Sequence, residues 1–266
     1  MLIIGEKINA SIPSSKKIIQ ALDESSLIEL AVKQVEAGAD FIDINVGTGS
    51  GSVADEINTM KWAVEKVQAH IDKPLCIDSA DAEVLSAGLS TVKNETCMIN
   101  STNAEKAQMD KVLHLAKTYD ADLVALPIDE QGIPATVEKR IDVCRRLLDA
   151  SEKYRIPGNK ILFDPLVLPI STDNRQGKVT LDTLAAIKKT FPESRTVMGL
   201  SNISYGLPQR KKINNSLMHM AIYAGLDAAI ANPNDELLME TIKTAEAVAG
   251  KDRHCRRYIR VFRNKN

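Results

Sequence analysis

The sequence predicts one α/β domain over residues 1–266, a single closed (β/α)8 barrel of the TIM type. Two observations predict it. Eight short apolar runs recur along the chain, and each is followed by a longer stretch in which apolar residues have helical spacing. The chain of 266 residues is also close to the roughly 250 residues that such a barrel uses as one domain.

The eight apolar runs are predicted to be parallel strands. Most of them are continuous rather than alternating, which is typical of strands that are buried on both faces. The runs are LII at 2–4, FIDINV at 41–46, PLCID at 74–78, TCMIN at 96–100, DLVAL at 122–126, KILFD at 160–164, RTVMGL at 195–200 and LDAAIA at 226–231. An open, doubly wound sheet is the alternative architecture, because eight parallel strands can also lie flat.

The stretches between these runs carry the signals that start and stop helices. Ser26 with Glu29 predicts a capping box at the start of the first long helix, and Gly38 predicts its end. Further helices are predicted at 103–118, near 135–155 and at 235–249. In total the pattern predicts eight or nine helices alternating with the strands.

The charge balance and the cysteines exclude several classes of protein. The 34 Lys and Arg residues nearly cancel the 35 Asp and Glu residues, so we expect no nucleic-acid partner and no membrane surface. The start, MLIIGEKINAS, lacks the features of a signal peptide, and no apolar run approaches the roughly 18 residues of a membrane span. The four cysteines are not clustered, which fits a cytoplasmic protein.

Polar residues end seven of the eight predicted strands. In a barrel, the carboxyl ends of the strands meet at the face that carries the active site. Taken in strand order, these residues are Glu6 and Asn9, Asp43 and Asn45, Asp78, Asn100 and Ser101, Asp164, Ser201 and Asn202, and Asn232. Any one of them is explained equally well as a cap of the next helix. Their recurrence on seven strands favours a binding site.

The residue types in this ring limit its chemistry. No Lys is present for a Schiff base, and the four His residues lie in predicted helices or in the tail, so we expect no bound metal. A carboxylate accepts two parallel N–H bonds, and an Asn side chain both donates and accepts. Together these groups match the amino-pyrimidinone edge of a pterin, although composition alone leaves a purine open.

At the same strand ends the sequence resembles a known family, the pterin-binding methyltransferases that act between methyltetrahydrofolate and corrinoid proteins. The resemblance runs along essentially the whole chain. Its motifs, in order, are MLIIGEKIN, FIDINVG, LCIDS, MINSTNAE, GIP at 132–134, FDPLVLP, GLSNIS and GLDAAIA. It looks closest to the branch that serves the corrinoid iron–sulfur protein of acetyl-CoA synthesis, or to relatives in quaternary-amine demethylation.

The resemblance implies roles for individual residues. Asn202, in GLSN, is expected to approach N5 of the substrate as the catalytic residue, and Arg210 is expected to order the loop after the seventh strand. Tyr205 stands where close relatives have Gln, which implies ring stacking in place of a polar contact. The remaining residues expected to hold or line the pterin are Asp78, Asn100, Asp164, Asp43, Asn45, Gly199 and Ser201.

The resemblance also implies the substrate and the partners. Tetrahydrofolate or methyltetrahydrofolate would be the substrate, and cobalamin would be carried by a separate corrinoid protein, because the chain has no DxHxxG segment. A homodimer is implied as well. Two alternatives stay open: a dihydropteroate synthase, whose Lys/Arg signature after the seventh strand is not evident, and a non-catalytic pterin-binding subunit.

Overall fold

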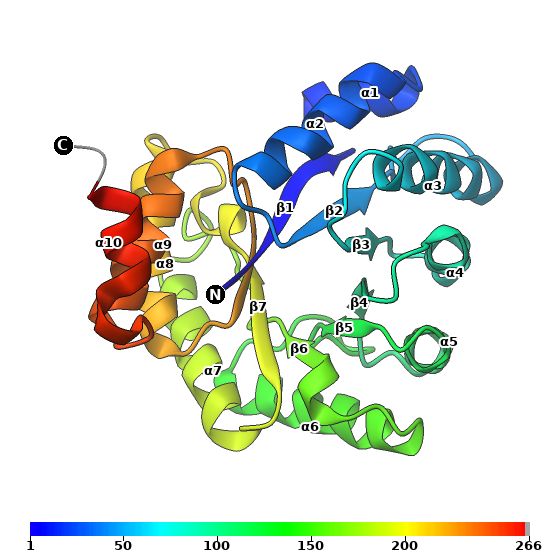
Figure 1. Ribbon diagram of the computed structural model, residues 1–266. Coiled ribbons are helices and arrows are strands. Elements are labelled where there is room, and N and C mark those ends of the chain that lie inside the picture. Colours follow the sequence, from blue (N-terminus) through cyan, green and yellow to red (C-terminus); the bar gives the residue numbers. More distant parts are fainter. Residues whose placement is uncertain (264–266) are drawn as a thin grey trace.

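The computed structural model describes residues 1–263, which form one closed barrel of eight parallel strands (Figure 1). The strands pair in chain order, and β8 closes the barrel by pairing with β1. The strands are β1 (Leu2–Asn9), β2 (Phe41–Asn45), β3 (Leu75–Asp78), β4 (Cys97–Thr102), β5 (Asp122–Ala125), β6 (Ile161–Phe163), β7 (Arg195–Gly199) and β8 (Ala228–Ala231). The predicted barrel is confirmed, and the open sheet is excluded.

Helices form a ring around the strands (Figure 1). They are α1 (Pro13–Gln20), α2 (Glu24–Glu36), α3 (Val53–Gln68), α4 (Ala82–Thr91), α5 (Lys106–Thr118), α6 (Val137–Lys153), α7 (Gln176–Thr190), α8 (Arg210–Ala224), α9 (Glu236–Val248) and α10 (Arg256–Phe262). Residues 1–263 thus hold ten α-helices instead of eight or nine, because short α1 and α10 are added to the repeat. Within the same residues, no helix is both long and apolar enough to cross a membrane.

The start of α2 differs from the predicted capping box. The N-cap is Asp23, whose carboxylate accepts from the Ser26 backbone N–H at 3.1 Å and from the Ser26 hydroxyl at 2.7 Å. A carboxylate is a strong acceptor at a helix N-terminus, so the N-cap lies three residues before Ser26 and the predicted capping box is wrong. Gly38 ends this helix as predicted, with a positive φ of 98°.

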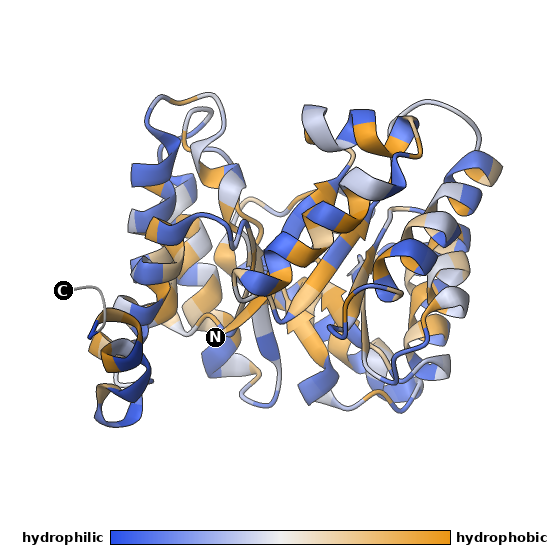
Figure 2. Ribbon diagram, turned by 45° about the horizontal axis from the view of Figure 1, so that its top comes forward, coloured by the Kyte–Doolittle hydropathy of each residue, from blue (hydrophilic) through white to orange (hydrophobic). Residues whose placement is uncertain are grey.

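The barrel has an apolar interior to which every strand contributes one buried residue. These residues are Ile4, Phe41, Cys76, Met98, Val124, Leu162, Val197 and Ala228. Figure 2 shows the strands as the most hydrophobic part of the fold, with hydrophilic residues on the outside of the helices. Side chains alternate along a strand, so the residue two positions further on also faces inward, nearer the carboxyl end. For β1, β2, β3, β4 and β6 that residue is a polar one from the predicted ring, within the strand or directly after it.

Close packing between α4 and β3 provides a test of the fold. A Cβ atom at Gly88 would lie 2.6 Å from Cγ2 of Ile77 and 3.0 Å from Cγ of Met60. We therefore expect Gly88→Ala to lower the free energy of unfolding by about 1–3 kcal/mol in urea titrations. Gly158→Ala is the control, because its nearest neighbour would lie at 3.5 Å. Equal losses in the two variants would contradict this packing.

Candidate active site

Four predicted site residues meet at the carboxyl ends of β2, β3 and β4. Asn45 is the register partner of Asp78, and Asp78 is the register partner of Asn100. The Asn100 side-chain N–H donates to Oδ1 of Asp43 at 3.3 Å. Parallel pairing brings these residues together although they are separated by up to 57 positions in the sequence.

The two carboxyl groups of this cluster are electrostatically linked. Burial raises the pKa of Asp43 well above its usual range, and the nearby Asp78 charge raises it further. Burial also raises the pKa of Asp78 to about 6, against the lowering effect of a hydrogen bond from Asn45. Oδ2 of Asp43 is buried and has no hydrogen-bond partner among residues 1–263. We therefore expect the pair to share one proton at neutral pH, because two adjacent buried carboxylates repel each other.

Asp164 lies at the end of β6, in contact with the end of β7. Its Oδ1 accepts from the Leu166 backbone N–H at 2.7 Å. Burial raises the pKa of Asp164 to about 6, while the backbone N–H groups of Leu166 and Gly199 and the charge of Arg140 act in the opposite direction. Asp164 and Gly199, which were each predicted to hold or line the pterin, are thus adjacent in the structure.

Arg140 supports this region and was not predicted from the sequence. Its side chain extends from α6 and is fully buried. Its guanidinium donates to the carbonyl oxygens of Pro134 (3.0 Å), Pro165 (2.6 Å) and Leu166 (3.1 Å). It therefore joins the loops that follow β5 and β6, next to Asp164. In the sequence it is one of several charged residues in an amphipathic helix, and no pattern distinguishes it from an exposed one.

The turn after β7 carries the predicted catalytic residue. This turn is the short 3-10 helix η2 (Leu200–Ser204), in which Asn202 is exposed. Arg210 donates from Nη2 to the Ser201 carbonyl at 2.7 Å and from Nε to Oγ of Ser204 at 3.0 Å. Arg210 thus bonds to two residues of the turn, and its ordering role stays a prediction. Tyr205 follows the turn with 68% of its surface exposed, so its proposed stacking on a pterin is not preformed.

Gly199 lies beside Asn202. A Cβ atom at position 199 would lie 3.5 Å from Nδ2 of Asn202, an ordinary van der Waals distance, so the two predicted site residues are neighbours. Opposite this turn, Glu6 accepts from the Ser201 hydroxyl at 3.2 Å. The sequence places Glu6 in the ring but assigns it no role, because its partner is distant along the chain.

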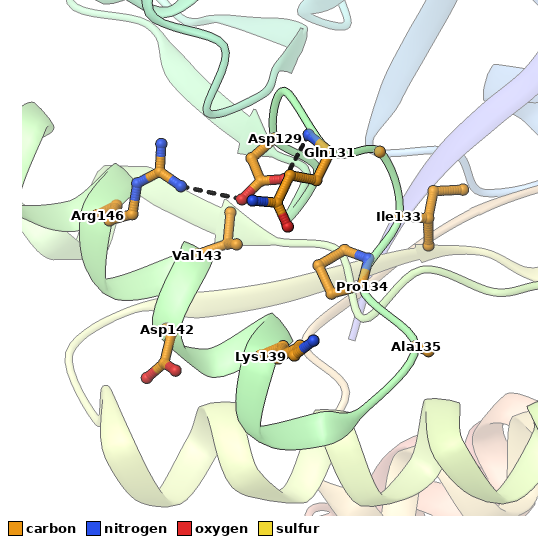
Figure 3. Close-up of a pocket in the computed structure, with 10 residues that line it drawn as sticks. Asp129, Gln131, Ile133, Pro134, Ala135, Lys139, Asp142, Val143 and Arg146 are labelled. Carbon is orange, nitrogen blue, oxygen red and sulfur yellow. Dashed lines mark hydrogen bonds and ion pairs between the residues drawn. The ribbon is translucent and has the colours of Figure 1, made fainter.

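A separate pocket of about 350 Å³ lies beside the loop after β5. Figure 3 shows Arg146 of α6 reaching Asp129 across one wall, with Ile133 and Pro134 of the GIP segment along another. None of the ring residues lines this pocket. Among residues 1–263, no group of three or more His, Cys, Asp or Glu side chains is arranged to hold a metal ion.

Comparison with known proteins identifies the family. The family described as "Pterin binding enzyme" matches residues 5–232. The chain belongs to this family. One relative of this pterin-binding enzyme is a methylcorrinoid:tetrahydrofolate methyltransferase of Eubacterium limosum, 37% identical over 265 residues that cover 99% of this chain and 96% of the relative.

Other relatives of the pterin-binding enzyme are longer or more distant. The methionine synthase of Mycobacterium leprae is 34% identical over 95% of this chain, which spans only 22% of that protein. Two dihydropteroate synthase structures have the same fold. A Yersinia pestis structure has a TM-score of 0.69 at 17% identity, covering 94% of this chain and 93% of that one. A Vibrio fischeri structure has a TM-score of 0.70 at 14% identity, covering 93% and 92%.

The free-energy cost of burying the carboxyl groups of Asp43 and Asp78 side by side can be measured. Asp43→Asn replaces the unpaired Oδ2 with an N–H donor next to Asp78, so we expect the free energy of unfolding at pH 8 to rise by about 1–3 kcal/mol. The raised pKa means that folding penalises the charged form of Asp43, so the gain should shrink as the pH is lowered towards 5. Exposed Asp72→Asn is the control. A less stable Asp43→Asn at pH 8 would contradict this electrostatic account.

Proposed function

We propose that this enzyme transfers a methyl group between N5 of tetrahydrofolate and the cobalt of a corrinoid carried by a separate partner protein. The observation that carries the proposal is the 37% identity, over nearly the full length of both chains, to a methylcorrinoid:tetrahydrofolate methyltransferase. The acids and amides at the barrel mouth also support it, because their hydrogen-bonding groups suit a pterin.

The residues of the ring fit a pterin. Asp164 has Oδ1 bonded to the backbone of its own loop, which fixes the orientation of the carboxylate. Asp43 has a buried oxygen without a partner, and Asn100 is oriented by Asp43. Such groups suit the N–H and carbonyl edge of the pterin, and each charge-assisted bond contributes roughly 1.5–3 kcal/mol. Asp43, Asn45, Asp78, Asn100 and Asp164 are therefore proposed to hold the ring.

Chemistry at N5 requires control of a proton. Removing the methyl group from N5 leaves negative charge on nitrogen unless a proton is supplied, and methylating tetrahydrofolate at N5 releases a proton. Asn202 is proposed to hydrogen-bond to N5 and so to stabilise the developing charge, while the proton itself is exchanged with water. Gly199 and Ser201 are proposed to line the same wall. Removal of one preorganised hydrogen-bond donor of this kind typically lowers the rate by about 10²–10³-fold.

The partner must reach N5 from outside the barrel. When bound to its own protein, the corrinoid supplies a cobalt centre that takes or gives the methyl group. The exposure of Asn202 supports this access, because the corrinoid on the partner protein must approach N5 where Asn202 contacts it. Exposed Tyr205 lies on the same turn and is proposed to close over the pterin when it binds. We also propose a homodimer in the cytoplasm.

Dihydropteroate synthase activity is less well supported. The synthase structures are at most 17% identical in the comparisons given above, and likeness at that level supports only a shared fold. A direct assay separates the activities. Mixed anaerobically with methylcobalamin and tetrahydrofolate, the protein should produce the visible spectrum of cob(I)alamin. Absence of that change, with turnover of a pterin pyrophosphate and p-aminobenzoate, would establish the synthase instead.

Asn202→Ala tests the catalytic assignment. The variant should keep its affinity for tetrahydrofolate within a few-fold, because the pterin is held by the other residues. Its rate of methyl transfer in stopped flow should fall by roughly tenfold or more, because the contact at N5 is lost. A rate equal to that of the wild type would remove the role assigned to Asn202.

The carboxylates of Asp78 and Asp164 make the affinity for tetrahydrofolate depend on pH. Both have a pKa of about 6, and only the ionised form accepts two N–H bonds, so binding measured by calorimetry should weaken as the pH falls through 6. Asp78→Ala or Asp164→Ala should weaken binding about tenfold or more at pH 7.5. Unchanged affinity in both variants would count against the ring-holding role.

A further inference from the structure

Glu6 faces the barrel mouth two positions after the inward-facing Ile4, at the start of a β-bulge in β1. Ile4 pairs with Phe41 and Gly5 with Ile42 of β2, but the next pair is Ile8 with Ile44, so three steps along β1 match two along β2. Gly5, before the bulge, faces α2, since a Cβ atom there would lie 2.6 Å from Oε1 of Gln34. A bulge of this kind re-aims side chains next to a binding site.

The side chain of Glu6 crosses to the turn after β7. Its Oε1 accepts the Ser201 hydroxyl hydrogen at 3.2 Å, a contact between residues 195 positions apart. On its other side, Ser201 is held through its carbonyl by Arg210 at 2.7 Å. Asn202 is the next residue in the chain. The turn that presents Asn202 is thus held between Glu6 on β1 and Arg210 on α8.

The environment of Glu6 indicates that this contact is costly to maintain. Burial raises the pKa of Glu6, while the hydrogen bond from Ser201 and the charges of Lys7 and Arg210 act in the opposite direction. A carboxyl group that is partly withdrawn from water and bonded to one hydroxyl gives up hydration for a single hydrogen bond. An apolar side chain at this position would avoid the cost of desolvating a carboxyl group. The hydrogen bond to Ser201 therefore points to a role other than stability.

We propose that Glu6 is a positioning residue for methyl transfer, which fixes Ser201 and thereby aims Asn202 at N5 of the substrate. The inference rests on the proposed role of Asn202 and adds to it. Glu6 holds the turn from inside the barrel and Arg210 holds it from outside. Small displacements of a catalytic group lower the rate strongly while leaving remote binding contacts intact.

Two substitutions of Glu6 separate positioning from other roles. Glu6→Ala removes the acceptor, whereas Glu6→Gln keeps an oxygen at the same place without the charge. We expect Glu6→Ala to lower kcat with methylcobalamin and tetrahydrofolate by roughly tenfold or more, with Kd for tetrahydrofolate within about threefold of the wild type. Glu6→Gln should restore most of the lost kcat. Glu29→Ala and Glu29→Gln, at an exposed position of α2, are the matched controls.

The partner residue gives a second, independent measurement. Ser201→Ala should lower kcat by a similar factor, and the double variant Glu6→Ala/Ser201→Ala should be no slower than either single variant, because both remove one contact. Additive losses would overturn the proposal. So would an equal loss of kcat in Glu6→Gln and Glu6→Ala, or a loss of tetrahydrofolate affinity with kcat unchanged.

The outcome can be distinguished from failure of the proposed function. Unaltered folate binding and thermal unfolding of the Glu6 variants would show that they fold. If the wild type transfers methyl groups and Asn202→Ala is slow while Glu6→Ala is not, only the positioning role fails. If the wild type transfers none, or Asn202→Ala is as fast, the proposed function or the proposed site fails first.

Discussion

Closure of the parallel sheet is the constraint on which the rest of the structure depends. The pairing of β1 with β8, in which Leu2 and Ile3 are the register partners of Ala228 and Ala229, turns an open row of strands into a ring. All strands then end at one mouth, and inward side chains from remote parts of the sequence face the same space. The hydrogen bond between Glu6 and Ser201 depends on this closure, because it brings β1 next to the end of β7 by way of β8.

The mouth of the barrel concentrates groups that are expensive to bury. Asp43, Asp78 and Asp164 all have a raised pKa, and in each case burial is the main cause. A core selected for stability alone would not place three carboxyl groups there. The arrangement is typical of a preorganised polar site, in which the fold meets the cost of desolvation before the ligand arrives. Arg140 is a buried cation in the same region, and its guanidinium donates hydrogen bonds to three backbone carbonyls.

Prediction from the sequence succeeded where local pattern and packing agree. Eight apolar runs became eight strands, with ends that moved by a few residues, because burial on both faces leaves a continuous apolar signal. It failed at the start of α2, where Asp23 and Ser26 are both acceptable caps and the stronger acceptor forms the cap. It also missed α1 as a separate helix. Pro13 starts that helix, but eight residues are too few for a clear periodic signal.

The sequence by itself determined the fold class and the identities of the ring residues, because strand ends are local features and a barrel places all of them at one face. Only the tertiary structure decided which of these residues touch, which carboxyl groups are buried enough to change their pKa, and that Arg140 and Glu6 bond to segments at this end of the barrel. Those properties depend on distances between segments that are far apart in the chain. Spacing within one segment contains no information about such distances.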